Sequence, residues 1–391
     1  MTPGVAVVLA GGGARGAYEA GVLSVLLPAL EAHGMRPDLF MGTSAGAINA
    51  VGLASRAHLR ATASSSAVLD LWREVHASSV FRGPLHGAFG KLLGRGHDSR
   101  QARALLDTAP LARTLERVVD WDRLHANVGE DGIAAVGVVA TSSCARHSTV
   151  FLEAAERLPR PPADAERAIV YVPTVLEARH VLASSAIPLL FPPVEIERPP
   201  EAAGWYFDGG VRLNTPIKPA LALGAARVVV VATAPVEPEE RPLPGHLAPV
   251  PGVGTAAARL LHAMLDDRMV EDLRTLALKN GPGLRGRVVP WLFGGPRGHD
   301  AGLLGRLVTE VLDGRAEGRG HRGPFRQLTR RALRRVLAGD PSRAELASYL
   351  YFDADFIEGA IRLGRRDAEM SLGPGGAPVW HDSRITRAPS A

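Results

Sequence analysis

The stretch VAVVLAGGGARG, residues 5–16, joins an apolar run to a glycine loop and decides the fold class. Residues Val5 to Ala10 form a continuous apolar run, which predicts a strand buried on both faces of a mainly parallel sheet. Gly11, Gly12 and Gly13 follow this run directly. Without side chains, their backbone N–H groups can turn towards one point, as an oxyanion hole requires. The stretch therefore predicts an α/β fold with a reactive site at the end of its first strand.

A second motif, GTSAG from Gly42 to Gly46, follows another apolar run, residues 39–42. Gly42 and Gly46 flank Ser44 where a nucleophile elbow needs residues without a Cβ, because strand and helix approach closely around a strained turn. The alanine-rich stretch from Ala45 to Ala54 predicts a helix, whose positive end would stabilise an alkoxide at Ser44. A serine in an ordinary strand-to-helix turn is the alternative.

The third motif is FDGG, Phe207 to Gly210, which supplies a carboxylate after an apolar and aromatic stretch. Asp208 is the candidate general base, with Gly209 and Gly210 as supporting residues. Its alternative is a turn aspartate, which propensity before two glycines also favours. A serine is a poor nucleophile until it is exposed and deprotonated and its oxyanion is stabilised. The three motifs together predict a serine acyl hydrolase.

These motifs resemble those of the patatin-like phospholipase family. The family's loop G-G-G-x-[KR]-G matches residues 11–16, and its serine and D-G-[GA] motifs match residues 42–46 and 208–210. Residues 183–191 and 348–356, and Asn214 with Pro216, are also similar to the family. The resemblance implies a three-layer α/β/α fold with a mainly parallel sheet and a helical C-terminal extension. It also implies a calcium-independent lipid acyl hydrolase acting on phospholipid or another acyl lipid, without a cofactor.

In this family an aspartate activates the serine directly, so the resemblance assigns Ser44 as nucleophile and Asp208 as base. It places Arg15 beside the oxyanion loop, although a solvated arginine is an alternative. A Ser-Asp-His triad, as in α/β-hydrolase esterases, is a second interpretation, with His246, His262 or His299 in the order that such triads take.

A non-catalytic nucleotide- or lipid-binding module is a third interpretation. Gly11, Gly13 and Gly16 match G-x-G-x-x-G after a strand. That motif requires an acidic residue at the end of a second strand, whereas Glu31 and Asp38 precede the next predicted strand.

Composition limits the location and the partners of the chain. With 391 residues, of which 46% are hydrophobic, it can bury a substantial core, and its one cysteine, Cys144, forms no internal disulfide. No apolar stretch approaches a spanning length of about 18 residues, and no signal-peptide pattern opens the chain. We expect a cytoplasmic protein that contacts membranes peripherally. The net charge of +5 suits anionic head groups, but no basic patch interleaved with aromatics indicates nucleic acid, and no carboxylate cluster indicates a metal. The oligomeric state stays open.

The pattern predicts one hydrolase domain over residues 1–370 and a disordered tail over 371–391. Strand and helix patterns alternate through a core of residues 1–235, and a sheet and helix extension follows over 252–296. A glycine- and arginine-rich segment, 297–323, reads as a mobile insertion. Closing helices occupy 324–370, with capping boxes that predict helix starts at Ser342 and Asp355.

The first of these closing helices, residues 324–337, is amphipathic, with an apolar face opposite five arginines. It fits an interfacial helix on a membrane or a helix packed on the core with a solvated basic face.

Overall fold

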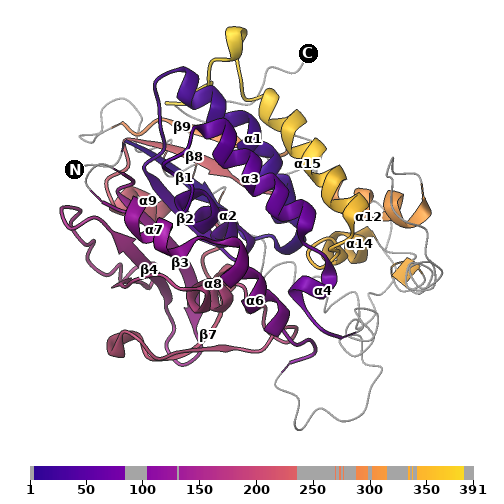
Figure 1. Ribbon diagram of the computed structural model, residues 1–391, viewed down its shortest axis with the longest axis horizontal. Helices are drawn as coiled ribbons and strands as arrows, with labels where there is room; N and C mark the ends of the chain where they lie inside the picture. Colours follow the sequence, from indigo (N-terminus) through magenta and orange to yellow (C-terminus); the bar gives the residue numbers. More distant parts are fainter. Residues whose placement is uncertain are drawn as a thin grey trace, which may run out of the picture.

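The computed structural model describes residues 4–83, 104–129, 132–235, 288–297, 302–314 and 341–382, and six further residues: Met269, Leu273, Leu276, Leu333, Arg334 and Leu337. Its centre is a mixed sheet whose main path runs in the order β5-β4-β3-β2-β1-β8-β9 (Figure 1). Five neighbouring strands run parallel: β1 (Val5–Leu9), β2 (Leu39–Thr43), β3 (Ala135–Ser142), β8 (Arg227–Val231) and β9 (Trp291–Gly294). This mainly parallel α/β architecture confirms the predicted fold class.

The other strands extend the sheet beyond β3. β4 (Ser148–Ala154) pairs antiparallel with β3, and β5 (Ile169–Pro173) pairs parallel with β4. β7 (Gly204–Asp208) pairs antiparallel with the last residues of β3 and with β6 (Val194–Ile196). Of these four strands, β7 contains the apolar and aromatic stretch that precedes the FDGG motif.

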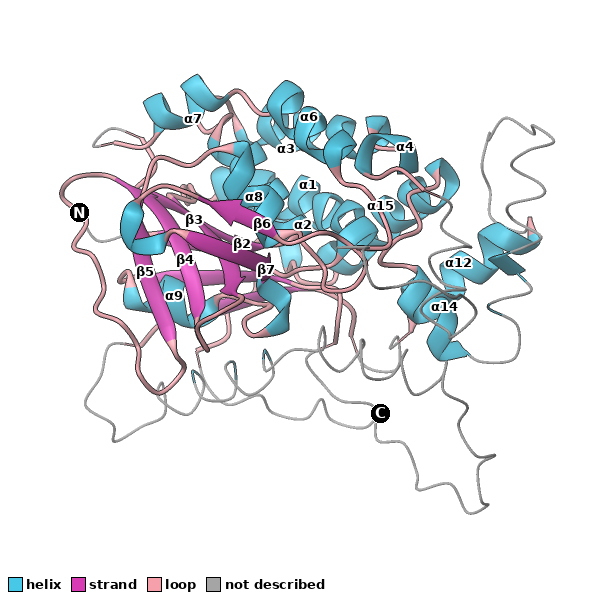
Figure 2. Cartoon of the chain, turned by 90° about the horizontal axis from the view of Figure 1, so that it is seen from below, coloured by secondary structure: helices cyan, strands magenta, loops and turns pink. Residues whose placement is uncertain are grey.

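Hydrophobic cores lie on both faces of the sheet because side chains alternate along its strands. In β1, Val5, Val7 and Leu9 face one core, while Ala6 and Val8 face the other. The first core is covered by α1 (Gly16–Ala32), α2 (Ala45–Ala54), α3 (Ala61–Glu74), α4 (Ala77–Val80), α6 (Ala109–Val118), α7 (Trp121–Asn127), α8 (Ala178–Ser184) and α15 (Ala354–Glu369). The second core receives α9 (Ile217–Ala222), on the opposite side of the sheet in Figure 2, and the side chains of Met269, Leu273 and Leu276.

The C-terminal part differs from its prediction in three places. Within the segment predicted to be a mobile insertion, α12 (Leu303–Asp313) is a helix that buries Leu304, Val308 and Val311 in the first core. Residues 371–382 of the predicted disordered tail are described, and His381 forms a β-bridge with Trp291 of β9. In α12, apolar positions among glycines and arginines supply the burial that stabilises the helix.

The third difference concerns helix starts. α14 (Pro341–Ala347) begins one residue before Ser342, and α15 begins at Ala354, with Asp353 as its cap. The Asp353 carboxylate accepts the N–H of Asp355, so the capping residue is two positions earlier than predicted.

Most of the amphipathic helix predicted over residues 324–337 lies outside the described residues. Leu333 and Leu337 are buried in the first core, and Arg334 is exposed and pairs with Asp313 at 3.1 Å. These residues fit the core-packed interpretation. Residues 236–251, between the predicted core and the predicted sheet and helix extension, lie outside the described residues.

Candidate active site

Ser44 lies on a strained turn between β2 and α2. Its backbone has φ 54° and ψ −122°, a conformation that a residue with a side chain adopts only when its surroundings impose it. The surroundings here are backbone. A Cβ on Gly42 would lie 2.3 Å from the Gly46 carbonyl oxygen, and one on Gly46 would lie 2.4 Å from that of Leu9. The strand and the helix therefore meet too closely for side chains at either position, and Ser44 is held at the carboxyl edge of the sheet.

The register of the strands brings Asp208 to the same place. Thr43, the last residue of β2, pairs with Val139 of β3, and the next residue of β3, Ala140, pairs with Asp208 at the end of β7. β7 thus continues along β3 from the point where β2 stops. A Cβ on Gly209 would lie 2.3 Å from the Val139 carbonyl oxygen, so this turn also needs glycine.

The Asp208 carboxyl group is buried and its pKa is raised from 3.8 to about 7. Burial disfavours the charged form and is the main cause, while the Ser44 side chain and the Gly210 N–H act in the opposite direction. Oδ1 accepts the Gly210 N–H at 2.7 Å. Oδ2 is buried and forms no well-aligned hydrogen bond with any described residue, although the Ser44 hydroxyl is near enough to lower the pKa of the carboxyl group. Contacts of this kind often shorten only when substrate binds.

The backbone N–H groups of the glycine loop are not equivalent. Gly11 lies against Ser44, since a Cβ there would be 3.2 Å from the serine Cβ. Its N–H is already donated to Asn214, at 3.0 Å to the side-chain oxygen and 3.2 Å to the carbonyl oxygen. Gly12 is the N-cap and Gly13 the first residue of a short 3-10 helix, Gly13–Arg15, and N–H groups at a helix start have no partner within the helix. Of the three predicted oxyanion donors, Gly12 and Gly13 are therefore the ones whose amides the local fold leaves available.

Arg15 is not solvated. Its side chain is 2% exposed and forms an ion pair with Glu345 at 2.6 Å. The alternative of a solvated arginine is wrong, because α14 and the turn after it cover this side chain.

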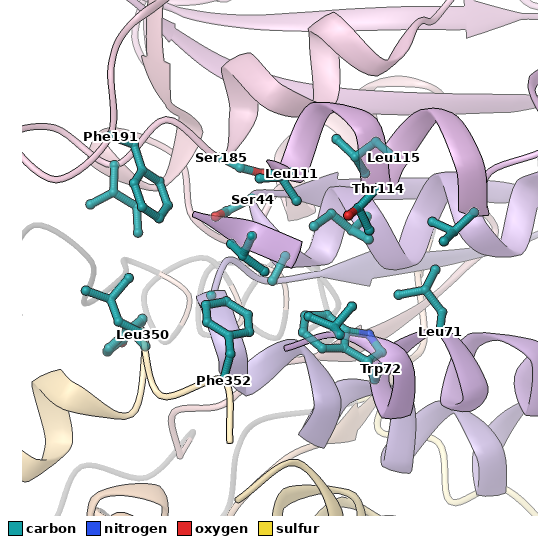
Figure 3. A pocket seen from close by; sticks show the side chains of 18 residues that line it. Ser44, Leu71, Trp72, Leu111, Thr114, Leu115, Ser185, Phe191, Leu350 and Phe352 are labelled. Carbon is teal, nitrogen blue, oxygen red and sulfur yellow. The ribbon is translucent and has the colours of Figure 1, made fainter. Parts of the chain in front are cut away.

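A largely apolar pocket of about 550 Å³ opens from Ser44. Figure 3 shows Ser44 with Ser185 and Leu111, and Leu71 and Leu115 further along the cavity. Its lining comes from α2, α3, α6, the segment after α8 and the segment after α14: Gly13, Ser44, Ala45, Ile48, Leu71, Trp72, Val75, Val80, Leu111, Thr114, Leu115, Val118, Ser185, Ile187, Phe191, Tyr349, Leu350 and Phe352.

Several residues that support this site carried no catalytic signal in the sequence. Ser184 accepts the Ser44 N–H at 2.8 Å, and its hydroxyl donates to the Val139 carbonyl, which fixes the nucleophile turn to β3. Trp72 donates its indole N–H to Asn49 at 2.7 Å, which fixes a wall of the pocket to α2. Ser184 and Asn214 lie in stretches that were noted only as similar to the family, so resemblance was the one signal that pointed to them.

The histidines of the alternative triad, His246, His262 and His299, lie outside the described residues. Among the histidines that the structure describes, none lines the pocket. The described residues contain no group of three His, Cys, Asp or Glu side chains that could hold a metal ion. They also contain no helix with the length and apolar character to cross a membrane.

The dinucleotide interpretation meets an obstacle in the loop itself. The Tyr349 carbonyl oxygen accepts the Ala14 N–H at 2.8 Å and occupies the space beside Gly13. A pyrophosphate at this helix start would need that space and that amide. Asp38 instead accepts the N–H groups of Gly4 and Val5, which anchors the start of β1.

Fold and site together define a class of α/β protein in which a strained serine and a buried carboxylate meet at the carboxyl edge of the sheet. The sequence model of the patatin-like phospholipase family matches residues 7–221, more than half of the chain, and the chain belongs to this family. It is accordingly a lipid acyl hydrolase in the broad sense, with a lipid as its partner.

Among solved structures, the crystal structure of VipD from Legionella pneumophila is similar at 15% identity and a TM-score of 0.33, covering 90% of this chain and 67% of that chain. No curated protein matches the chain significantly.

Proposed function

We propose that the protein hydrolyses carboxylic esters of phospholipids or related acyl lipids through a Ser44–Asp208 dyad. The observation that carries this proposal is the buried Asp208 carboxyl group, whose pKa is raised to about 7, beside a serine held on a strained turn. A carboxylate with an ordinary pKa is too weak a base at neutral pH, whereas one near 7 is half ionised there and accepts a proton more readily.

The reaction proceeds in two halves. Asp208 takes the hydroxyl proton as the Ser44 oxygen attacks the ester carbonyl carbon, and the amides of Gly12 and Gly13 hold the resulting oxyanion. The intermediate collapses to an acyl-enzyme, and the leaving alcohol takes the proton from Asp208. Water then attacks the acyl-enzyme after giving a proton to Asp208, and the free acid leaves as Ser44 regains its proton.

The pocket supports a lipid substrate because its apolar lining suits an acyl chain. Its wall is built almost entirely from aliphatic and aromatic side chains, and Ser44 lines the same pocket. An acyl chain bound in the pocket would therefore bring its ester carbon to Ser44. Peripheral contact with anionic membranes and a cytoplasmic location remain predictions.

The decisive test is Ser44→Ala. The purified variant should keep its fold and lose at least about 10⁴-fold in turnover of a p-nitrophenyl ester, since a sole nucleophile is removed. Wild type should also react covalently with a fluorophosphonate, and the variant should not. Retained turnover in Ser44→Ala would contradict the assignment of Ser44 as the nucleophile.

Asp208→Asn distinguishes the dyad from a triad. We expect a loss similar to that of the serine variant, because residues that act as a unit are not additive. A nearly active Asp208→Asn, together with an essential His246, His262 or His299, would replace the dyad with a triad. Turnover should be insensitive to EDTA in either case.

A further inference from the structure

Arg15 joins the glycine loop to a segment far beyond the residues that match the family. Its Nε donates to the Ser348 hydroxyl oxygen at 2.7 Å. Its Nη2 donates to the Glu345 carbonyl oxygen and carboxylate, each at 2.6 Å. The guanidinium carbon lies 3.7 Å from the centre of the Tyr349 ring. These contacts direct the arginine towards residues 345–349 and engage two of its nitrogens there.

Residues 345–349 also contact the glycine loop through their backbone. The Tyr349 carbonyl oxygen accepts the Ala14 N–H at 2.8 Å. Gly13 has φ 54°, and a Cβ on it would lie 2.1 Å from that carbonyl oxygen. The conformation of Gly13, and with it the direction of the neighbouring amides, is therefore fitted to Tyr349.

The segment then continues into the wall of the pocket. Tyr349, Leu350 and Phe352 line the cavity opposite α6, as the labelled Leu350 and Phe352 show in Figure 3. Phe352 packs edge-on against Phe81 at 6.1 Å between ring centres. One short stretch thus contacts both the loop beside Ser44 and the cavity that leads away from it.

We propose that residues 345–352 are a positioning element of the active site, and that Arg15 is the positioning residue that fastens this element to the glycine loop. The proposal rests on the proposed function, because it assigns the Gly12 and Gly13 amides to the oxyanion. Displacements of about 1 Å at such donors cost about 100-fold in rate. The guanidinium group of Arg15 donates its hydrogen bonds to Glu345 and Ser348. Arg15 therefore acts on the reaction through the glycine loop.

A second contact extends the element into α12. Glu345 Oε2 accepts the Gly305 N–H at 2.9 Å, and a Cβ on Gly305 would lie 2.7 Å from the Glu345 N atom. Glu345 therefore bridges the glycine loop and α12, and its carboxylate is fixed from two sides. A residue held in this way makes a rigid support for Arg15.

The test uses Ser348→Ala and Glu345→Ala in the full-length protein, with Glu358→Ala as matched control. Glu358 pairs with Arg73 at 2.8 Å and also ties a C-terminal helix to the N-terminal part, but both side chains are about 40% exposed and far from the loop in sequence. Ser348→Ala leaves the Arg15–Glu345 ion pair intact, so it serves if Glu345→Ala does not fold. Thermal unfolding first establishes that each variant is folded at the assay temperature.

We expect kcat for a short-chain ester to fall about 10- to 100-fold in Ser348→Ala and Glu345→Ala, with KM within about twofold. The rate of fluorophosphonate labelling should fall by a similar factor, and Glu358→Ala should match wild type in both. Hydrogen exchange of the peptide that spans residues 11–16 should accelerate in the two element variants only. A purely structural role would lower thermal stability without this split between kcat and KM.

Folded element variants with wild-type kcat and wild-type exchange at residues 11–16 would overturn the proposal. A direct action of Arg15 on the oxyanion would also overturn the proposal. Both variants keep the positive charge of Arg15, so in that case they would keep wild-type turnover. The exchange comparison distinguishes a failure of the proposed function from a failure of the positioning role. A wild type that neither hydrolyses esters nor reacts with the fluorophosphonate contradicts the proposed function, while loop exchange still decides the positioning role.

Discussion

At the residue scale, burial of Asp208 would serve catalysis in the proposed dyad, and it lowers stability wherever the carboxyl group is ionised. A carboxyl group with no hydrogen bond to Oδ2 from the described residues holds its proton tightly, and its pKa rises to about 7. The same desolvation that strengthens the base makes its ionised form unfavourable in the folded protein. Activity and stability should therefore respond to pH in opposite directions.

The first consequence concerns the pH profile of catalysis. Only ionised Asp208 accepts the Ser44 proton, so kcat/KM should rise with pH through about 7 and level off above it. At pH 5 the rate should be about 100-fold below the plateau, because about one molecule in a hundred is then ionised. Initial rates with a soluble ester between pH 5 and 9 measure this. A flat profile from pH 5 to 8 would contradict Asp208 as the base.

The second consequence concerns stability. Between the unfolded pKa near 3.8 and the folded pKa of about 7, the folded state binds the proton that the unfolded state releases. The free energy of unfolding therefore falls as pH rises through this window. Asp208→Asn cannot ionise, so we expect it to be more stable than wild type at pH 8 by up to about 4 kcal/mol, with no such gain at pH 4. Chemical denaturation at the two pH values checks this, and an equal difference at both would contradict the burial argument.

At the element scale, α6 contributes Leu111, Thr114, Leu115 and Val118 to the pocket that we propose for the acyl chain. Each methylene that the chain buries contributes about 0.8 kcal/mol, or about fourfold in kcat/KM, until the cavity is filled. Leu115 is 1% exposed and lies further along the cavity from Ser44 in Figure 3. We expect Leu115→Phe to lower turnover of long-chain esters while sparing the acetate ester.

The matched control for this prediction is Leu124→Phe on α7. Leu124 is fully buried in the same core but does not line the pocket. Leu124→Phe overfills the core, which costs about 1 to 3 kcal/mol, whereas Leu115→Phe extends into the cavity, so the control should lose at least as much stability while its ester series stays like wild type. A p-nitrophenyl ester series from two to sixteen carbons measures the selectivity, and an unchanged series in Leu115→Phe would remove the acyl chain from this pocket.

The elements that the sequence predicted well are those with continuous apolar runs or fixed motifs. The parallel strands β1 and β2 end within one residue of the apolar runs that predicted them, 5–10 and 39–42, since burial on both faces leaves an unbroken apolar signal. Gly42, Ser44 and Gly46 were recognisable because close backbone approach demands glycine around the turn.

Other elements depend on partners that lie far away in the sequence. β4 begins with Ser148 and Thr149, which are buried polar residues of a strand paired on both edges, and local periodicity does not mark it. The donation of the Gly11 N–H to Asn214 spans 203 positions. The glycine loop alone therefore predicted three equivalent oxyanion donors, and it could not show that one of their N–H groups, that of Gly11, is donated to Asn214.

At the scale of the whole molecule, α15 packs against α1 as part of the hydrolase body. The two helices lie side by side in Figure 1, one near each end of the described chain. Small residues allow their close approach: a Cβ on Gly21 would lie 2.3 Å from the Ile361 carbonyl oxygen. Tyr18 reinforces the contact by donating its hydroxyl to Asp367 at 2.7 Å. The C-terminal helices thus stabilise the element that carries the glycine loop.

This packing predicts that Gly364→Ala destabilises the entire domain. A Cβ on Gly364 would lie 2.0 Å from the Tyr18 carbonyl oxygen, so α15 must move away from α1. We expect the free energy of unfolding to fall by about 1 to 3 kcal/mol in a single cooperative transition, because the two helices share one core.

Gly52→Ala is the control, since it makes the same substitution in helix α2 where the nearest atom, in Val68, lies 3.6 Å away. That variant should be neutral or gain up to about 1 kcal/mol from helix propensity. Thermal and urea unfolding, followed by circular dichroism and by residual esterase activity, measure both variants. If Gly364→Ala unfolded in two steps, with activity surviving the first, α15 would be separable from the catalytic body. One transition in which structure and activity are lost together makes the C-terminal helices part of the enzyme's single folding unit.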